Sequence, residues 1–136
     1  MALAVDALDH LVVNVRDVEV AAAWYQRVLG MRREDVDAGA DRGRRTSMHF
    51  GRQKINLRPV SATQEQWITA DHESAGSDDL CFLTTVAPEA VVAHLRACDV
   101  PIIAGPGERR GAEGTIVSVY CRDPDGSLIE ISSYKR

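Results

Sequence analysis

An internal repeat constrains the fold of this chain more than any other feature of its sequence. Residues 9–31 superpose on residues 78–100 without a gap. In both segments a polar pair precedes an apolar stretch of strand type, and residues with the periodicity of an amphipathic helix follow. The chain is therefore expected to fold as two similar modules, each of which begins with a strand and a helix.

The helical parts of both segments carry start or stop signals. In the first segment, Asp17 suits the N-cap position and Gly30 suits the C-terminal stop. In the second segment, Pro88 suits an early helical position, and Val91 and Leu95 recur on one helical face. The sequence therefore predicts one amphipathic helix in each module.

After its helix, each half continues with a loop, a strand, a turn and another strand. In the second half the turn is the DPDG sequence at residues 123–126, where Pro fixes φ and Gly accepts a positive φ. We interpret the halves as two β-α-β-β-β modules, residues 8–60 and 78–135, joined by a polar linker at residues 61–77. The predicted fold class is α+β, with the modules forming a curved mixed sheet.

The superposition also pairs four polar residues at inward-facing strand positions. His10 falls on Asp79 in the gapless block, and Asn56 falls on Glu130 when the final strands are aligned. Because strand side chains alternate between faces, a twofold arrangement of the modules would bring all four to the mouth of the sheet. One imidazole, two carboxylates and one amide suit a divalent cation such as Mn²⁺, Fe²⁺, Mg²⁺ or Zn²⁺.

Each of these four residues also has an interpretation without a metal. His10 could hydrogen-bond the backbone, Asp79 could bond local backbone amides, and Glu130 could face solvent from a half-buried strand. Asn56 could hydrogen-bond a metal-bound water instead of the metal.

Three further residues are candidates for contact with a substrate. Arg58 lies two residues beyond Asn56 and could hold a carboxylate or phosphonate, or could lie at a surface edge. Arg109 lies in the glycine-bracketed segment 105–114, which is either a loop over the site mouth or a solvated hairpin or connector. His72 in the linker could take part in proton transfer.

Composition excludes several classes of partner. The net charge of -4 and the pI of about 5.5 argue against nucleic acid or an anionic membrane as the main partner. No window approaches the roughly 20 apolar residues of a membrane span, and the N-terminus lacks a basic region before its apolar residues. The three cysteines are widely spaced and suggest neither a disulfide framework nor a zinc knuckle. A cytoplasmic protein is expected.

Together these features resemble the vicinal oxygen chelate superfamily, which includes glyoxalase I, fosfomycin-resistance thiol transferases, type I extradiol dioxygenases and bleomycin-resistance proteins. The resemblance rests on the paired modules, on His10 in DHLVVNV, on the helix AAAWYQRVLGM and on the DPDG-x-x-x-E ending at Glu130. It covers nearly the whole chain and implies a single domain of this fold, residues 1–136. It is specific for the fold and not for the reaction.

The resemblance implies roles for the four site residues. His10 corresponds to the first-strand metal ligand of the family, and Glu130 to its last-strand glutamate. Asp79 stands where most active members have a second histidine, which departs from the two-histidine, one-carboxylate set of the iron dioxygenases. Asn56 stands where glyoxalases have a fourth, glutamate ligand, which departs from the lactoylglutathione lyases.

The resemblance also implies an activity and an assembly. The leading expectation is a divalent-metal enzyme, a glyoxalase-like lyase or transferase acting on a small oxygenated or thiol-conjugated metabolite, with Glu130 and Asp79 as catalytic residues. The alternatives are a ring-cleaving extradiol-type dioxygenase and a metal-free binding protein of the bleomycin type. Short members of the family usually form homodimers, in which His10 of one chain would face Asp79 and Glu130 of the other.

Overall fold

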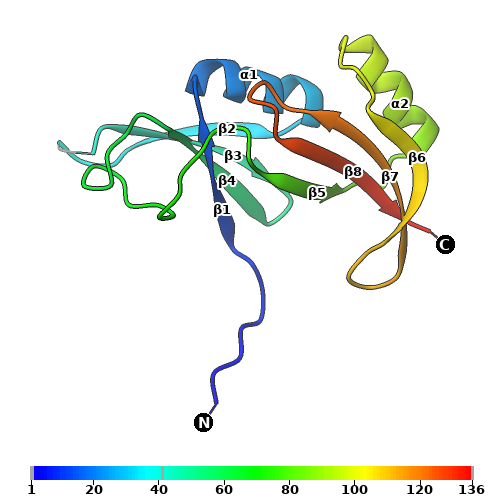
Figure 1. Ribbon diagram of the computed structural model, residues 1–136, viewed down its shortest axis with the longest axis horizontal. Helices are drawn as coiled ribbons and strands as arrows, with labels where there is room; N and C mark the ends of the chain where they lie inside the picture. Colours follow the sequence, from blue (N-terminus) through cyan, green and yellow to red (C-terminus); the bar gives the residue numbers. More distant parts are fainter. Residues whose placement is uncertain (1, 41, 136) are drawn as a thin grey trace. The chain divides into compact units, whose positions relative to one another are not determined.

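The computed structural model describes residues 2–40 and 42–135, and the chain divides into two compact units, Met1–Glu73 and Ser74–Arg136. Each unit contains one helix and one four-stranded mixed sheet (Figure 1). The predicted α+β fold class, with two β-α-β-β-β modules, is confirmed.

In the first unit the sheet order is β1-β4-β3-β2, with β1 and β4 parallel and the other neighbours antiparallel. Its elements are β1 (His10–Val15), α1 (Val18–Leu29), β2 (Arg32–Asp37), β3 (Arg44–Phe50) and β4 (Gln53–Pro59).

The second unit repeats this plan in the order β5-β8-β7-β6, with β5 and β8 parallel. Its elements are β5 (Asp79–Leu83), α2 (Pro88–Ala97), β6 (Ala104–Arg110), β7 (Thr115–Arg122) and β8 (Leu128–Tyr134).

The predicted helix signals of α1 are present. Asp17 Oδ1 accepts hydrogen bonds from the backbone N–H groups of Glu19 at 2.9 Å and Val20 at 3.2 Å. Gly30 ends the helix with φ 67, a left-handed conformation that glycine adopts without strain. Helix α2 begins at Pro88, as the sequence predicted, and its N-cap position has no side-chain hydrogen bond.

One face of each sheet packs against the helix of the same unit (Figure 1). The buried residues of the first unit include Val13, Val15, Tyr25, Met48, Ile55 and Leu57. Those of the second unit include Val91, Leu95, Val119, Cys121, Ile129 and Ile131. Because strand side chains alternate, the residues between these buried positions lie on the face that the helix does not cover.

Two segments that the sequence analysis left as loops are strands. Segment Arg32–Asp37 forms the edge strand β2, and most of the segment that contains Arg109 forms the edge strand β6. Arg109 lies in β6 of the β6–β7 hairpin, which agrees with the solvated-hairpin alternative and not with a loop or an irregular connector. Gly105 permits the pairing of β6 with β7, because a Cβ there would lie 2.3 Å from the carbonyl oxygen of Ser118.

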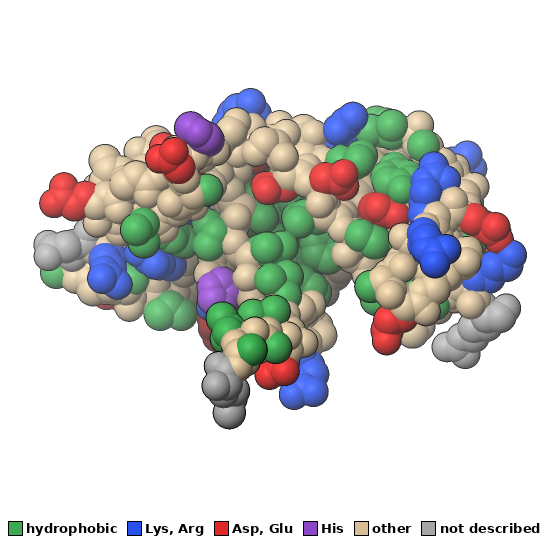
Figure 2. All heavy atoms as spheres, turned by 60° about the horizontal axis from the view of Figure 1, so that its bottom comes forward, with side chains coloured by type: hydrophobic (Ala, Val, Ile, Leu, Met, Phe, Trp, Pro, Cys, Tyr) green, Lys and Arg blue, Asp and Glu red, His purple; other side chains and the backbone are tan. Residues whose placement is uncertain are grey.

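The surface carries charges of both signs. On the face shown in Figure 2, acidic and basic side chains are interspersed, and neither forms a continuous stripe. Neither helix of the described chain is long and apolar enough to cross a membrane.

Candidate metal and substrate site

The strand registers place the four predicted site residues at equivalent positions of the two units. The ladder partner of His10 lies two residues before Asn56, and the ladder partner of Asp79 lies two residues before Glu130. All four side chains belong to the sheet face that the helix of their unit leaves uncovered. Each unit thus presents one pair of polar side chains with the same spacing.

In the first unit, the imidazole of His10 is oriented by its neighbour. His10 Nδ1 lies 2.8 Å from Asp9 Oδ2, and the His10 side chain is 45% exposed. A carboxylate on one ring nitrogen fixes the ring and leaves Nε2 to bind a cation, an arrangement that recurs around metal-ligating histidines. The local sequence therefore supplies a ligand together with its supporting carboxylate.

Asn56 is held from the adjacent strand. Its Oδ1 accepts a 2.7 Å hydrogen bond from Ser47 Oγ, and Ser47 is the ladder partner of Asn56 on β3. The amide oxygen keeps a second lone pair, which could accept from a water or contact a cation. This arrangement is compatible with both interpretations of Asn56.

In the second unit, Glu130 belongs to a compact hydrogen-bonded cluster. Glu130 Oε2 accepts a 2.6 Å bond from Ser118 Oγ and a longer 3.4 Å bond from Ser132 Oγ. The two serine hydroxyls are 2.7 Å apart, and Cys81 Sγ donates to Ser132 Oγ at 3.4 Å. The carboxylate is therefore fixed in orientation through one oxygen.

Tyr120 and Arg109 extend this cluster. Tyr120 is the ladder partner of Glu130 on β7, and the Arg109 guanidinium lies 5.4 Å from the centre of the Tyr120 ring. Burial raises the pKa of the Tyr120 hydroxyl, and a hydrogen bond to Glu130 and the negative charge of Glu130 raise it further. Tyr120 therefore stays protonated and able to donate at neutral pH.

Asp78 and Asp79, at the start of β5, have different roles. Asp78 binds the two residues after the DPDG turn through its backbone, because its N–H donates to Ser127 Oγ at 3.1 Å and its carbonyl accepts from Leu128 N at 2.9 Å. Burial and the charge of Asp123 raise the pKa of the Asp78 carboxyl. The Asp79 side chain is exposed on the uncovered face of the sheet.

The surface-edge alternative for Arg58 is wrong. Arg58 is 0% exposed, and its guanidinium donates to Asn14 Oδ1 at 2.8 Å and to the carbonyl oxygens of Trp67 at 3.0 Å and Ala62 at 2.7 Å. It thereby fastens the segment after β4 to the sheet. A substrate role for Arg58 stays a prediction, and its donors are already engaged by the fold.

His72 lies at the surface. Its side chain is 95% exposed, and its Nε2 lies 3.6 Å from Asp71 Oδ2. The proton-transfer role of His72 stays a prediction.

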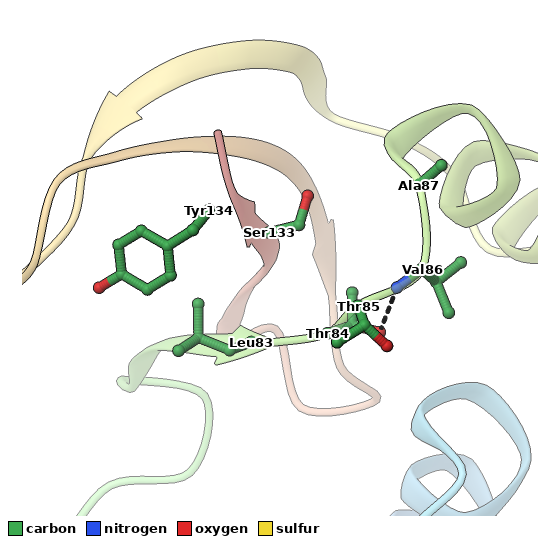
Figure 3. A pocket seen from close by; sticks show the side chains of 7 residues that line it. All are labelled: Leu83, Thr84, Thr85, Val86, Ala87, Ser133 and Tyr134. Carbon is green, nitrogen blue, oxygen red and sulfur yellow. Dashed lines mark hydrogen bonds between the residues drawn. The ribbon is translucent and has the colours of Figure 1, made fainter. Parts of the chain in front are cut away.

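A hollow in the second unit lies outside this cluster, where β5 ends and α2 begins (Figure 3). Residues 83–87 line it together with Ser133 and Tyr134, so its polar groups are hydroxyls and backbone. Thr84 Oγ1 already accepts from the N–H of Val86 at 3.1 Å. The hollow has no carboxylate or imidazole among its lining residues.

The described residues contain no group of three or more His, Cys, Asp or Glu side chains poised to hold a metal ion. Neither unit alone therefore supplies a complete ligand set. The first unit carries an imidazole and an amide, and the second unit carries two carboxylates. These donor types fit a divalent cation.

The residues that support the candidate ligands were not predicted from the sequence. These are Asp9, Ser47, Ser118 and Tyr120. The position of Asp9 beside His10 was a usable signal. The other three contacts depend on strand register, which the repeat alone does not define.

Comparisons with known proteins agree with the paired-module architecture. The family model described as Glyoxalase/Bleomycin resistance protein/Dioxygenase superfamily matches residues 7–131. Virulence protein STM3117 of Salmonella typhimurium is 41% identical over 130 residues, which cover 96% of this chain and 85% of that protein.

Two further relatives extend this comparison. Glyoxalase domain-containing protein RDO1 of Mycosarcoma maydis is 38% identical over 133 residues, covering 98% of this chain and 71% of that protein. The solved structure of integron cassette protein VCH_CASS1, from the mobile metagenome of V. Cholerae, has a TM-score of 0.90 at 39% identity. That match covers 99% of this chain and 100% of the other.

The two β-α-β-β-β modules and their polar sheet faces define a protein of the vicinal oxygen chelate fold. The chain belongs to the Glyoxalase/Bleomycin resistance protein/Dioxygenase superfamily.

Proposed function

We propose that this protein is a divalent-metal-dependent enzyme in which His10, Asp79 and Glu130 hold the metal and Asn56 lies beside it. The observation that carries the proposal is the shared register, which gives both units a polar pair with the same spacing on the same sheet face. Mn²⁺, Zn²⁺, Fe²⁺ and Mg²⁺ are the candidate ions.

The supporting contacts favour ligand roles over ordinary surface roles. Asp9 holds the ring of His10, and Ser118 holds one oxygen of Glu130 at 2.6 Å, which leaves a ring nitrogen and a carboxylate oxygen for a cation. Such outer partners commonly fix the orientation and basicity of metal ligands. A solvent-facing carboxylate would need neither of the serine hydroxyls that Glu130 binds.

The proposed reaction is that of a glyoxalase-like lyase or transferase acting on a small oxygenated or thiol-conjugated metabolite. A divalent cation supplies Lewis acidity that stabilises negative charge developing on substrate oxygens. The chain's own part is to move and hold protons. Asp79 or Glu130 would accept a proton from the substrate, and Tyr120, protonated at neutral pH, would donate a hydrogen bond to the carboxylate.

We further propose a homodimer in which the ligand pairs of two chains combine. Each unit has only one pair of candidate ligands, so a complete set requires a pair of each kind. In a shared site, His10 of one chain would face Asp79 and Glu130 of the other.

Metal-dependent stabilisation tests the proposal. Protein purified without a metal-affinity tag and treated with EDTA should show a higher Tm after addition of Mn²⁺, Zn²⁺ or Fe²⁺, because a ligand that binds only the folded state stabilises it. The Tm of a His10→Ala variant should not respond. An unchanged Tm of the wild type with all these ions would instead support a metal-free binding protein.

A further inference from the structure

Arg45 and Arg58 belong to the sheet face of the first unit opposite helix α1, and both donate to carbonyl oxygens of the segment that follows β4. Strands β3 and β4 pair Thr46 with Leu57, and the two arginines lie directly beyond this last ladder pair, one on each strand. Like charges on adjacent strands repel each other. A structure that retains such a pair therefore requires a compensating group.

Arg58 is compensated by neutral groups only. Its guanidinium donates to the amide oxygen of Asn14 and to backbone carbonyl oxygens of Ala62, Thr63 and Trp67. These dipoles satisfy its N–H groups without cancelling its charge. The positive charge of Arg58 therefore produces a positive electrostatic potential at this face of the sheet.

Arg45 is less satisfied than Arg58. Its guanidinium lies 4.1 Å from the centre of the Trp67 ring, and its Nη2 donates to the carbonyl oxygen of Gln66 at 3.3 Å. Its Nε is buried and has no hydrogen-bond partner among the described residues. Burial, and then the charge of Arg42, lower the pKa of Arg45, in keeping with the lack of a carboxylate partner.

Other arginines of the same unit have acidic partners. Arg33 binds Glu19 at 2.6 Å and Asp35 at 3.0 Å, and Arg44 binds Asp35 at 3.1 Å. No carboxylate of the described chain lies within 4.0 Å of Arg45 or Arg58. Arg45 and Arg58 thus lie on the same face of the sheet, and neither has a carboxylate partner there among the described residues.

We propose that Arg45, stacked on Trp67 and reinforced by the charge of Arg58, forms a subsite for an anionic group of a small molecule. The group is a carboxylate, phosphate or phosphonate, whose oxygens match the planar guanidinium donors. An anion bound at the guanidinium would offset the repulsion between the two arginines.

The inference that the anion belongs to the substrate rests on the proposed function. Arg58 lies two residues from Asn56 on β4, which corresponds to about 7 Å along a strand. A substrate of the proposed enzyme would therefore carry its anionic group on the same sheet face as the oxygens that meet the metal. Anion binding itself does not require the metal.

The fluorescence of Trp67 provides the test, because the chain has only two tryptophans. In a Trp24→Phe variant, Trp67 is the single reporter and Arg45 stacks on it. Acetate, inorganic phosphate and methylphosphonate are titrated in the presence of EDTA, and NaCl at equal ionic strength serves as the reference. Calorimetric titration of the unsubstituted chain repeats the measurement without relying on Trp24→Phe.

The proposal predicts a saturable response to at least one of these anions that NaCl does not reproduce. Arg45→Gln should weaken this binding roughly tenfold or more, since a charge-assisted pair is lost. Arg44→Gln, the neighbour on the opposite face, should leave it unchanged. A response no larger than that of NaCl, equal binding by Arg45→Gln, or equal loss in Arg44→Gln would overturn the proposal.

Because EDTA is present throughout, the outcome is independent of the metal site. Anion binding without any metal-dependent rise in Tm would contradict the proposed function alone. The converse result would contradict the anion subsite alone.

Discussion

Ser118 Oγ donates a 2.6 Å hydrogen bond to Glu130 Oε2, between adjacent strands of the second sheet. Ser118 is 0% exposed, so this donor is fixed by the packing around it. The bond orients the carboxylate before any ligand arrives. A carboxylate whose orientation is fixed in advance binds a cation more tightly than a mobile one.

The loss of this bond should weaken metal binding. We expect Ser118→Ala to lower the affinity for Mn²⁺ or Zn²⁺ by about tenfold, within the 10 to 100-fold effect typical of outer metal partners. Calorimetric titration of EDTA-treated protein measures the effect, and Ser133→Ala, one residue from Ser132 and outside the Glu130 cluster, is the matched control. Equal affinities of Ser118→Ala and wild type would remove Ser118 from the site.

Mixed dimers should reveal whether sites are shared between chains. His10→Ala and Glu130→Ala chains are each expected to lack stoichiometric metal. If each site combines ligands of two chains, a mixed dimer of the two variants should regain one metal per dimer. Elemental analysis of differently tagged, co-purified chains measures this, and a mixed dimer that stays free of metal would rule out the shared arrangement.

Removal of the Arg58 guanidinium should destabilise the first unit. Arg58→Met leaves the carbonyls of Ala62, Thr63 and Trp67 and the Asn14 amide oxygen without this donor, at a cost of about 2–4 kcal/mol in the free energy of unfolding. Urea titration followed by circular dichroism measures the loss. Arg52→Met, on an exposed turn residue, should cost little, and similar losses in both variants would contradict the fastening role of Arg58.

Asp35 should make stability depend on acid pH. A hydrogen bond from Thr46, and then the bond and charge of Arg33, lower the pKa of Asp35 to about 2. A folded-state pKa below the unfolded value stabilises the fold above about pH 4, and this contribution is lost as pH falls toward 2. Unfolding measured at pH 7, 4 and 2.5 should show this loss in the wild type.

The Asp35→Asn variant should be less stable at pH 7 and should lose less stability on acidification. Asp6→Asn, on the exposed N-terminal arm, is the control and should follow the wild type. Parallel acid dependence of Asp35→Asn and wild type would show that Asp35 makes no such contribution.

The repeat predicted the fold well because strand and helix periodicities are local signals. Both helices, with the Asp17 cap and the Pro88 start, follow directly from the sequence. Strands β2 and β6 were not predicted, because they are edge strands whose sequences lack an alternation of apolar and polar residues. The sequence of β2 is RREDVD and that of β6 is AGPGERR. Their pairing comes from neighbouring strands and not from burial of their own side chains.

For the candidate metal site, the sequence could predict the candidate ligands but not the residues that support them. His10, Asp79, Asn56 and Glu130 follow from aligning the repeat, and the ladder registers place them equivalently. Arg58 shows the limit, because a buried arginine and a surface arginine have the same local sequence signal. What separates them is the fold of the following segment, whose carbonyl oxygens receive the guanidinium.

Metal content of the purified protein tests the central claim most directly. Protein prepared without a metal-affinity tag is analysed for Mn, Fe, Zn and Mg, together with Glu130→Ala and the matched control Glu108→Ala, an exposed glutamate paired with Lys135. We predict close to one divalent ion per chain in the wild type and in Glu108→Ala, and almost none in Glu130→Ala. Full retention of metal by Glu130→Ala would contradict the assignment of the site.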